Sequence, residues 1–340
     1  VKLCLSIKQE ILKHNLPNYN KRIDVFSFIK AIQNLLSELK KRKGLWFTIL
    51  TVMSVLGISL SMYLLTSMTS KISEEVYANM SVTYKNNLEY KFEDKQKELR
   101  KIILGLKIND TFRNNLENKE LLDPVIATYN KALVELGLDS ITLTYYSTIN
   151  QTNQYRNIIN SVINRKIATF GVEVLSDGPN VVFLEPILSG ENVVGVVEIK
   201  ESLISIKKDF ERNKQSIFVF LMQEKMMANL AIDAKNGRYR PVVDDLRVEE
   251  QKYDGGFFAN VIEEGEDGFK DLKNKGYSVN KEYFKTYKEI LDVNGVTVGY
   301  VLIGEQVQGN GGFVNIVDNM TKSVTMIALG LVISILLFMF

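Results

Sequence analysis

Residues 194–201 read VGVVEIKE and residues 298–305 read VGYVLIGE, and these two stretches decide the predicted fold. Both begin with Val-Gly and end with Glu, and both follow a turn and a strand that ends in Ile-Leu. Their β-branched content is typical of strands. An internal repeat of this length predicts two successive α/β units, each with a helix packed on an antiparallel sheet that ends in a long hairpin.

The sequence around the repeat supplies the other elements of both units. Alternating, β-branched runs predict strands, and helical spacing predicts the helices between them. The strands are expected at 140–146, 169–175, 181–188, 193–200, 217–222, 283–292 and 296–305, and helices at 153–166 and 201–214. Residues 110–136 are helical but contain Pro124, which predicts two helices there. Polar loops rich in Asp-Gly and Glu-Gly are expected from 236 to 276.

Two uncharged apolar runs lie outside the repeat, LWFTILTVMSVLGISLSMYLLTS at 45–67 and SVTMIALGLVISILLFMF at 323–340. About 20 apolar residues cross a hydrocarbon core of about 30 Å, so each run predicts a membrane span. The basic cluster at 40–43 places that end in the cytoplasm. The first run is too long, and too far from the N-terminus, for a cleaved signal peptide. Residues 68–322 are therefore expected to be extracytoplasmic.

Helical periodicity continues beyond the first apolar run. Apolar residues recur at intervals of four and seven from Ile72 to Ile103, and neither Gly nor Pro intervenes before Gly105. We therefore expect one helix of about 60 residues, formed by the span and its outward continuation. Such a helix can pack beside a second copy of the chain and carry a small displacement across the bilayer.

The charge distribution is uneven, although the formal net charge is only +2. Residues 1–44 carry a net charge of +7, which leaves −5 for residues 68–322 because both apolar runs are uncharged. A nucleic-acid-binding protein would gather its basic residues on the folded domain, so nucleic acid is not an expected partner. The basic arm instead predicts amphipathic helices, broken at Pro17, on the inner membrane face.

No catalytic or cofactor signature is found in the outer segment. The only Cys and the only His are Cys4 and His14, which excludes disulfides, Cys-His or Ser-His-Asp catalysis and a His/Cys zinc site from residues 68–322. No phosphate-binding glycine loop occurs, and 309–312 is expected to be a flexible joint. The acidic residues at 263–267 lack the regular spacing of a calcium loop, so no metal is expected.

Five residues of the first α/β unit are candidate ligand-binding groups. Tyr145 and Tyr146 are adjacent on a strand, so only one of them can line a cavity, and we select Tyr145. Arg156 and Arg165 carry guanidinium groups that suit two-point binding of a ligand carboxylate. Phe183 and Glu185 share one face of the next strand. In the simpler interpretation the aromatic residues belong to the core and the arginines to the surface.

The whole arrangement resembles the double Cache sensor region of bacterial transmembrane receptors. The resemblance covers residues 68–318 and rests on EPIL at 185–188 with VVGVV at 193–197, and on DVNGVTVGYVLI at 292–303. It implies an α+β fold, two PAS-like units in tandem on a long helix between two transmembrane helices. The expected parts are a basic arm (1–44), a first span (45–67), an outer helix (68–110), a membrane-distal unit (111–212), a membrane-proximal unit (213–310), a linker (311–322) and a second span (323–340).

The resemblance also implies a function. We expect a non-enzymatic chemotaxis receptor of the bacterial cell membrane, without cofactor, that is homodimeric and binds a small molecule in its distal unit. The chain reads as a fragment at both ends, with a cytoplasmic signalling module expected after Phe340. The alternatives are the sensor region of a histidine kinase or diguanylate cyclase, and a protein-interaction module without a ligand. The Tyr/Arg/Trp/Tyr pattern of amino-acid-binding members is incomplete because the only Trp is Trp46, which argues against an amino-acid ligand.

Overall fold

The computed structural model describes residues 30, 34, 43–149, 155–213, 216–307 and 313–339. The chain divides into two units, one formed by residues 1–69 with 324–340 and the other by residues 70–323. Nearly all of the predicted basic arm lies outside the described residues, and so does the predicted joint at 309–312. The boundaries expected between the distal unit, the proximal unit and the linker stay predictions.

Two long helices supply the described residues of the first unit. Helix α3 spans Lys43–Lys107 and helix α10 spans Phe313–Met339, and one end of each belongs to this unit. In the part of the chain that the structure describes, no helix combines the length and apolar character needed to cross a membrane. The spans predicted at 45–67 and 323–340 are therefore not confirmed. The predicted long helix is confirmed, because α3 is continuous for 65 residues.

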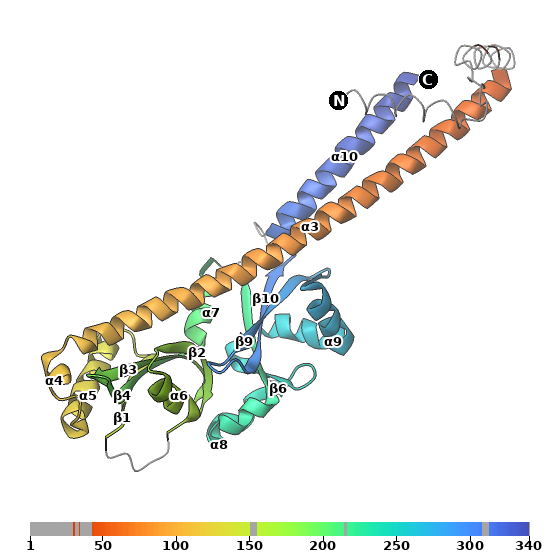
Figure 1. Ribbon diagram of the computed structural model, residues 1–340. Coiled ribbons are helices and arrows are strands. Elements are labelled where there is room, and N and C mark those ends of the chain that lie inside the picture. The colour runs from red at the N-terminus through yellow and green to blue at the C-terminus, as the bar shows by residue number, and fades with distance from the viewer. Residues whose placement is uncertain are drawn as a thin grey trace, which may run out of the picture. The chain divides into compact units, whose positions relative to one another are not determined.

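The second unit contains two antiparallel sheets (Figure 1). The first sheet has four strands in the order β1-β4-β3-β2. Its strands are β1 (Ile141–Ser147), β2 (Thr169–Leu175), β3 (Gly178–Ser189) and β4 (Asn192–Ser202). All four were predicted, β1 from its alternation and the others from their strand-like runs, within three residues at each end.

The second sheet has six strands in the order β6-β7-β5-β10-β9-β8. Strands β5, β9 and β10 were predicted, whereas the three- and four-residue strands β6, β7 and β8 are too short to show a pattern. The bounds are β5 (Ile217–Gln223), β6 (Tyr239–Pro241), β7 (Leu246–Glu249), β8 (Tyr277–Val279), β9 (Tyr283–Leu291) and β10 (Thr297–Gln306).

The internal repeat occupies equivalent places in the two sheets. Residues 194–201 lie in β4, which is paired on its two sides with β1 and with β3. Residues 298–305 lie in β10, which is paired on its two sides with β5 and with β9. In both cases the repeat forms the second strand of a hairpin and an interior strand of its sheet. The prediction of two related antiparallel sheets, each ending in a long hairpin, is therefore confirmed.

Helix α3 packs against both sheets through the part that belongs to the second unit. Four of its apolar residues, Leu88, Leu99, Ile103 and Leu106, are fully buried. Polar side chains of α3 also reach the strands. Tyr84 donates a hydrogen bond to the buried carboxylate of Glu305 at the end of β10. The ammonium group of Lys95 lies 3.0 Å from the buried carboxylate of Glu201 in β4.

Shorter helices complete the second unit. Two helices precede the first sheet. The break between them lies at 115–118, before Pro124, and the side chains of Asn109 and Asn118 cap the N-termini of the two helices. Pro124 is accommodated inside the second helix. The bounds are α4 (Asp110–Asn114), α5 (Lys119–Glu135), α6 (Asn157–Arg165), α7 (Ile204–Phe210) and α8 (Ile232–Lys235), with 3₁₀ turns at Glu211–Asn213, Glu224–Asn229 and Glu250–Lys252.

Helix α9 (Gly255–Lys275) corrects the loop predicted over 236–276. The Glu-Gly and Asp-Gly pairs there indicated turns, but Phe257, Phe258, Val261 and Phe269 form a buried stripe that holds the segment on the sheet as a helix. The glycine signal was partly right, because Gly265 has a positive φ of 67° and produces a kink inside the helix.

Candidate functional site

A cavity of about 860 Å³ lies on the face of the first sheet that carries α6. Strands β1, β2 and β4 form its floor, α6 forms one wall, and the β9–β10 hairpin of the second sheet forms another. Its lining residues are Thr144, Tyr146, Tyr155, Arg156, Asn157, Ile158, Glu173, Val174, Leu175, Ser176, Glu198, Lys200, Asn229, Asp292, Val293 and Asn294.

Strand alternation places the polar side chains in this cavity. Successive residues of a strand point to opposite faces, so Tyr145 faces the core below α3 while Tyr146 faces the cavity. Glu198 and Lys200 of β4 and Glu173 of β2 also lie on the cavity face. Helix α6 is held beside them by a separate apolar cluster formed by Ile158, Ile159, Val162, Val182, Leu184 and Val196.

Arg156 is the centre of a charged network at this site. Its guanidinium donates one hydrogen bond to Glu173, at 2.6 Å, and another to Glu198. Tyr146 donates a hydrogen bond of 2.8 Å to the second oxygen of Glu198. The ring of Tyr155 stands edge-on to Tyr146, with 5.3 Å between centroids. The network therefore joins α6 to β1, β2 and β4.

Burial and charge shift the titration of these groups in different directions. Burial lowers the pKa of Arg156, but attraction to Glu198 and Glu173 outweighs it and raises that pKa overall. Burial raises the pKa of Glu173, and repulsion from Glu198 and Asp292 adds to this, so that Arg156 only partly opposes the rise. Burial and the neighbouring Glu198 raise the pKa of Tyr146 to about 12, which keeps the phenol protonated at neutral pH.

The cavity carries more carboxylates than cations. Its acidic groups are Glu173, Glu198 and Asp292, and its basic groups are Arg156 and Lys200. Lys200 is itself paired with Asp177 at 2.8 Å. Because Arg156 already binds two glutamates, an anionic ligand would have to displace one of them. The side chains suit a ligand that brings a positive charge of its own.

The structure does not bring the five predicted site residues together. Only Arg156 lines the cavity. Tyr145 and Phe183 are buried in the core, where the Tyr145 hydroxyl donates to the carbonyl of Leu116 at 2.8 Å. Arg165 is exposed in the last turn of α6. The choice of Tyr145 is corrected to Tyr146, because the alternation of β1 puts Tyr146 on the cavity face.

Glu185 lies on the other face of the first sheet. It pairs with Lys107 of α3 at 2.8 Å, beside a smaller cavity of about 400 Å³. Glu173, Glu198 and Asp292 were missed by the sequence analysis. Alternation along β2 and β4 could have indicated that the two glutamates share a face with Tyr146, whereas nothing local to 292–294 indicates that the hairpin reaches the first sheet.

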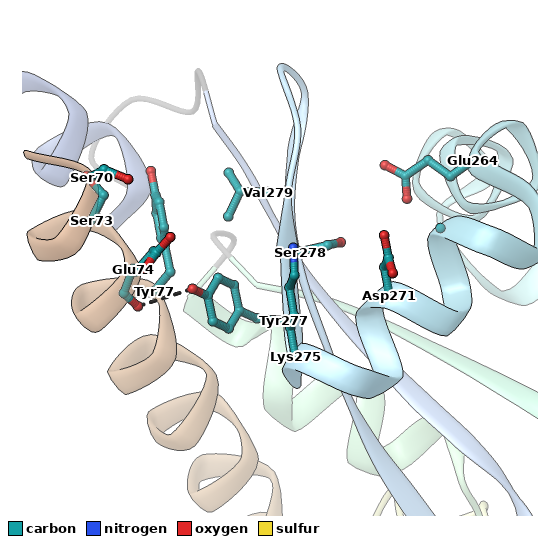
Figure 2. Close-up of a pocket in the computed structure, with 11 residues that line it drawn as sticks. Ser70, Ser73, Glu74, Tyr77, Glu264, Asp271, Lys275, Tyr277, Ser278 and Val279 are labelled. Atoms are coloured by element: carbon teal, nitrogen blue, oxygen red, sulfur yellow. Dashed lines mark hydrogen bonds between the residues drawn. The ribbon is translucent and has the colours of Figure 1, made fainter. Parts of the chain in front are cut away.

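A further hollow of about 800 Å³ lies between α3, α9 and β8 (Figure 2). Tyr277 of β8 donates a hydrogen bond to the carbonyl of Glu74 in α3, at 3.2 Å, and so ties the strand to the helix across this hollow. Glu264, which also lines it, is engaged by Lys285 at 2.5 Å. Among the described residues, no group of three or more His, Cys, Asp or Glu is placed to hold a metal ion.

Several solved structures are similar to this chain. The extracellular domain described as that of a histidine kinase, vpHK1S-Z8, has a TM-score of 0.43 and 13% identity, and the match covers 68% of this chain and 95% of that one. The ligand-binding domain of the Campylobacter jejuni chemoreceptor Tlp3, in complex with L-valine, has a TM-score of 0.41 and 8% identity, with 71% and 95% covered. The periplasmic domain of Vibrio cholerae LuxQ has a TM-score of 0.37 and 12% identity, with 66% and 98% covered.

No protein family and no curated protein matches the chain in sequence. The similar structures include an extracellular domain described as that of a histidine kinase and the ligand-binding domain of a chemoreceptor. Their TM-scores all lie below 0.5.

Proposed function

We propose that this chain is the sensing region of a membrane receptor and that the cavity beside α6 binds a small organic cation. The cavity of about 860 Å³ contains two tyrosine rings and more carboxylates than basic groups, and this composition supports the proposal. Aromatic faces and carboxylates both attract ammonium groups. This replaces the expectation that arginines hold a ligand carboxylate, because the guanidinium of Arg156 is already bound to Glu173 and Glu198.

Thermal melting of the full chain with three matched probes tests the ligand class. We expect n-butylamine to raise the melting temperature, and butyrate and n-butanol, which share its length, to have little effect. Ligand that binds only the folded state stabilises it in proportion to the logarithm of its concentration. The variant Tyr146→Leu should weaken the response, whereas Leu136→Ala, at an exposed site at the end of α5, should leave it unchanged. Stabilisation by butyrate but not by butylamine would refute a cationic ligand.

The proposed location is the bacterial cell membrane, with residues 68–322 extracytoplasmic. It is supported by the uncharged runs at 45–67 and 323–340. It is also supported by large apolar residues that are exposed in the unit formed by residues 1–69 with 324–340, since such surfaces mark membrane or protein contacts. Examples, with their exposed fractions, are Leu56 (59%), Leu60 (61%), Tyr63 (71%), Met326 (77%) and Ile327 (65%).

Labelling of intact cells by a membrane-impermeant maleimide tests this topology. In a Cys4→Ser background, a cysteine introduced by Lys208→Cys, at an exposed position of α7, should react in intact cells. A cysteine introduced by Lys8→Cys, in the basic arm, should react only after lysis. The opposite pattern would overturn the proposed orientation.

We also propose that the receptor is a homodimer that packs through α3 and signals in chemotaxis. Ile72, Val82, Tyr90 and Leu104 are between 48% and 62% exposed. At 3.6 residues per turn they lie on one side of the helix, opposite its buried residues. Oxidative cross-linking through Tyr90→Cys should yield dimers, whereas Lys131→Cys on α5 should not. Swimming assays in gradients of butylamine, with and without the gene, test the proposed output.

A further inference from the structure

The tip of the β9–β10 hairpin is built as a rigid turn that belongs to the second sheet. The Asp292 carboxylate accepts hydrogen bonds of 2.8 Å from the backbone N–H groups of both Asn294 and Val296 through the same oxygen, Oδ1. Gly295 completes the turn with a φ of 79°, a conformation that glycine adopts without strain. The second carboxylate oxygen, Oδ2, is not used by these turn contacts.

This tip lies against the first sheet, although 292–294 follows the strands of that sheet by about a hundred residues of sequence. Val293 packs on the apolar cluster beneath α6. A Cβ atom added to Gly171 of β2 would come within 2.7 Å of the Val293 side chain. Glycine at 171 therefore allows the close approach of the hairpin. Asp292, Val293 and Asn294 all line the ligand cavity as a result.

We infer that the hairpin tip forms part of the ligand site and that Asp292 favours a positively charged ligand there. A ligand that displaces the tip would also displace the second sheet, to which the tip belongs. This inference rests on the proposed function for the identity of the ligand, but not for the contact itself. A ligand held between β2, β4 and the tip touches both sheets at once.

The path from the tip into the second sheet is short and continuous. Strand β10 begins just after the turn; it pairs with β9 from Thr297 to Gln306 and with β5 from Gly299 to Gly304. Near its other end the buried Glu305 accepts a hydrogen bond from Tyr84 of α3. A displacement of the tip is therefore applied to a strand whose far end is bonded to the long helix. A ligand biases such a contact only by its different affinity for two arrangements.

A labelled hairpin tests the inference without any ligand. In a Cys4→Ser, Asn294→Cys chain, an environment-sensitive thiol dye reports on the tip. Filling the cavity by Thr144→Phe, or separately by Ser176→Phe, should shift the dye emission. Thr142→Phe is the matched control, because Thr142 is on the same strand and face but does not line the cavity. Unchanged emission in folded Thr144→Phe and Ser176→Phe chains would overturn the inference.

The charge of Asp292 is tested with n-butylamine as the probe. We expect Asp292→Asn to bind it about fivefold more weakly, the size of one screened charge contact. Glu289→Gln is the control, since Glu289 lies on the same hairpin outside the cavity. Equal binding by Asp292→Asn and the parent chain would remove Asp292 from the site. Absence of butylamine binding by the parent chain, with a responsive dye, would refute the proposed ligand class and leave the contact between the tip and the cavity intact.

Discussion

The two sheets are built on one plan and differ in what covers their second face. In each, the repeat strand is interior, buried side chains of α3 join the core on one face, and α6 or α9 packs against the sheet. The repeat ends in a buried glutamate in both sheets, and α3 binds each one. Glu201 meets the ammonium of Lys95, and Glu305 meets the phenol of Tyr84. The shared glutamate therefore attaches each sheet to the same helix.

The helices on the opposite faces set the two sheets apart. Helix α6 has nine residues and leaves room beside it for the charged cavity. Helix α9 has 21 residues and fills the corresponding space with Phe257, Phe258 and Phe269, all almost fully buried. The repeated strand motif thus provides two attachments to α3, while the helices on the opposite faces differ in length and in the side chains that they place on the sheet.

The largest expected change in stability comes from the attachment between Lys95 and Glu201. Lys95→Met should lower the free energy of unfolding by about 3–5 kcal/mol, because it leaves the Glu201 carboxylate buried without its cation. Both side chains are 6% exposed. Chemical denaturation of the full chain measures the change. Lys97→Met, whose side chain is 67% exposed, is the matched control and should change stability by less than about 0.5 kcal/mol. A loss below about 1 kcal/mol for Lys95→Met would show that Glu201 does not depend on the pair.

The glycine in the second position of the repeat has different neighbours in the two sheets. A Cβ atom at Gly299 would collide with the backbone carbonyl of Leu221, whereas at Gly195 it would collide with the ring of Tyr145. A backbone cannot yield as a side chain can, so Gly299→Ala should cost about 3 kcal/mol, at the upper end for overpacking. Gly195→Ala should cost less, and Tyr145→Leu should recover part of it. The opposite order in thermal melting would contradict the assigned packing.

The second attachment should be weaker than the first. Tyr84→Phe removes a neutral donor from the buried Glu305 and should cost about 2 kcal/mol, typical of a hydrogen bond to a charged group. Leu136→Ala, at a residue that is 74% exposed at the end of α5, is the control and should have little effect. Burial and Glu305 both raise the pKa of Tyr84, so its phenol stays protonated throughout the measurement range. A cost equal to that of Lys95→Met would remove the distinction between the two attachments.

The smallest effect concerns pH and is confined to the sheet with the cavity. The pKa of Glu173 is raised above 4.5 chiefly by burial, so the folded chain binds this proton more tightly than the unfolded chain. Its contribution to stability is present at low pH and is lost as pH rises through the folded pKa. Glu173→Gln should therefore gain stability relative to the parent chain at pH 7, and the gain should shrink below the raised pKa. Melting curves from pH 4 to pH 8 measure it, and a gain that does not change with pH would contradict the shift.

Much of the fold could be predicted from local pattern. Strands of seven or more residues show either alternation or a continuous apolar run rich in β-branched and aromatic residues, and α3 shows an uninterrupted helical period, so these elements were predicted within a few residues. The repeat predicted two related sheets because its two copies carry the same constraints. The failures have a common physical cause. Strands β6, β7 and β8 and helix α9 are fixed by tertiary contacts that outweigh local turn signals.

The candidate site was predicted only in part. Arg156 lines the cavity, and its role in ligand binding stays a prediction; its two glutamate partners come from β2 and β4, and a sequence does not show which strands are neighbours. The choice between Tyr145 and Tyr146 depended on which face of β1 is covered by α3 and α5. Asp292 could not be assigned at all, because its contact with the first sheet depends on how the two sheets pack.

The attachments at Tyr84 and Lys95 have a consequence for how the chain can change over evolution. At 1.5 Å per residue the two side chains are about 16 Å apart along the axis of α3, and each added residue turns the helix by about 100°. Inserting one residue between them would swing one side chain away from its glutamate while the other stayed in place. We therefore expect related chains to vary in length in the loops before they vary between these two positions.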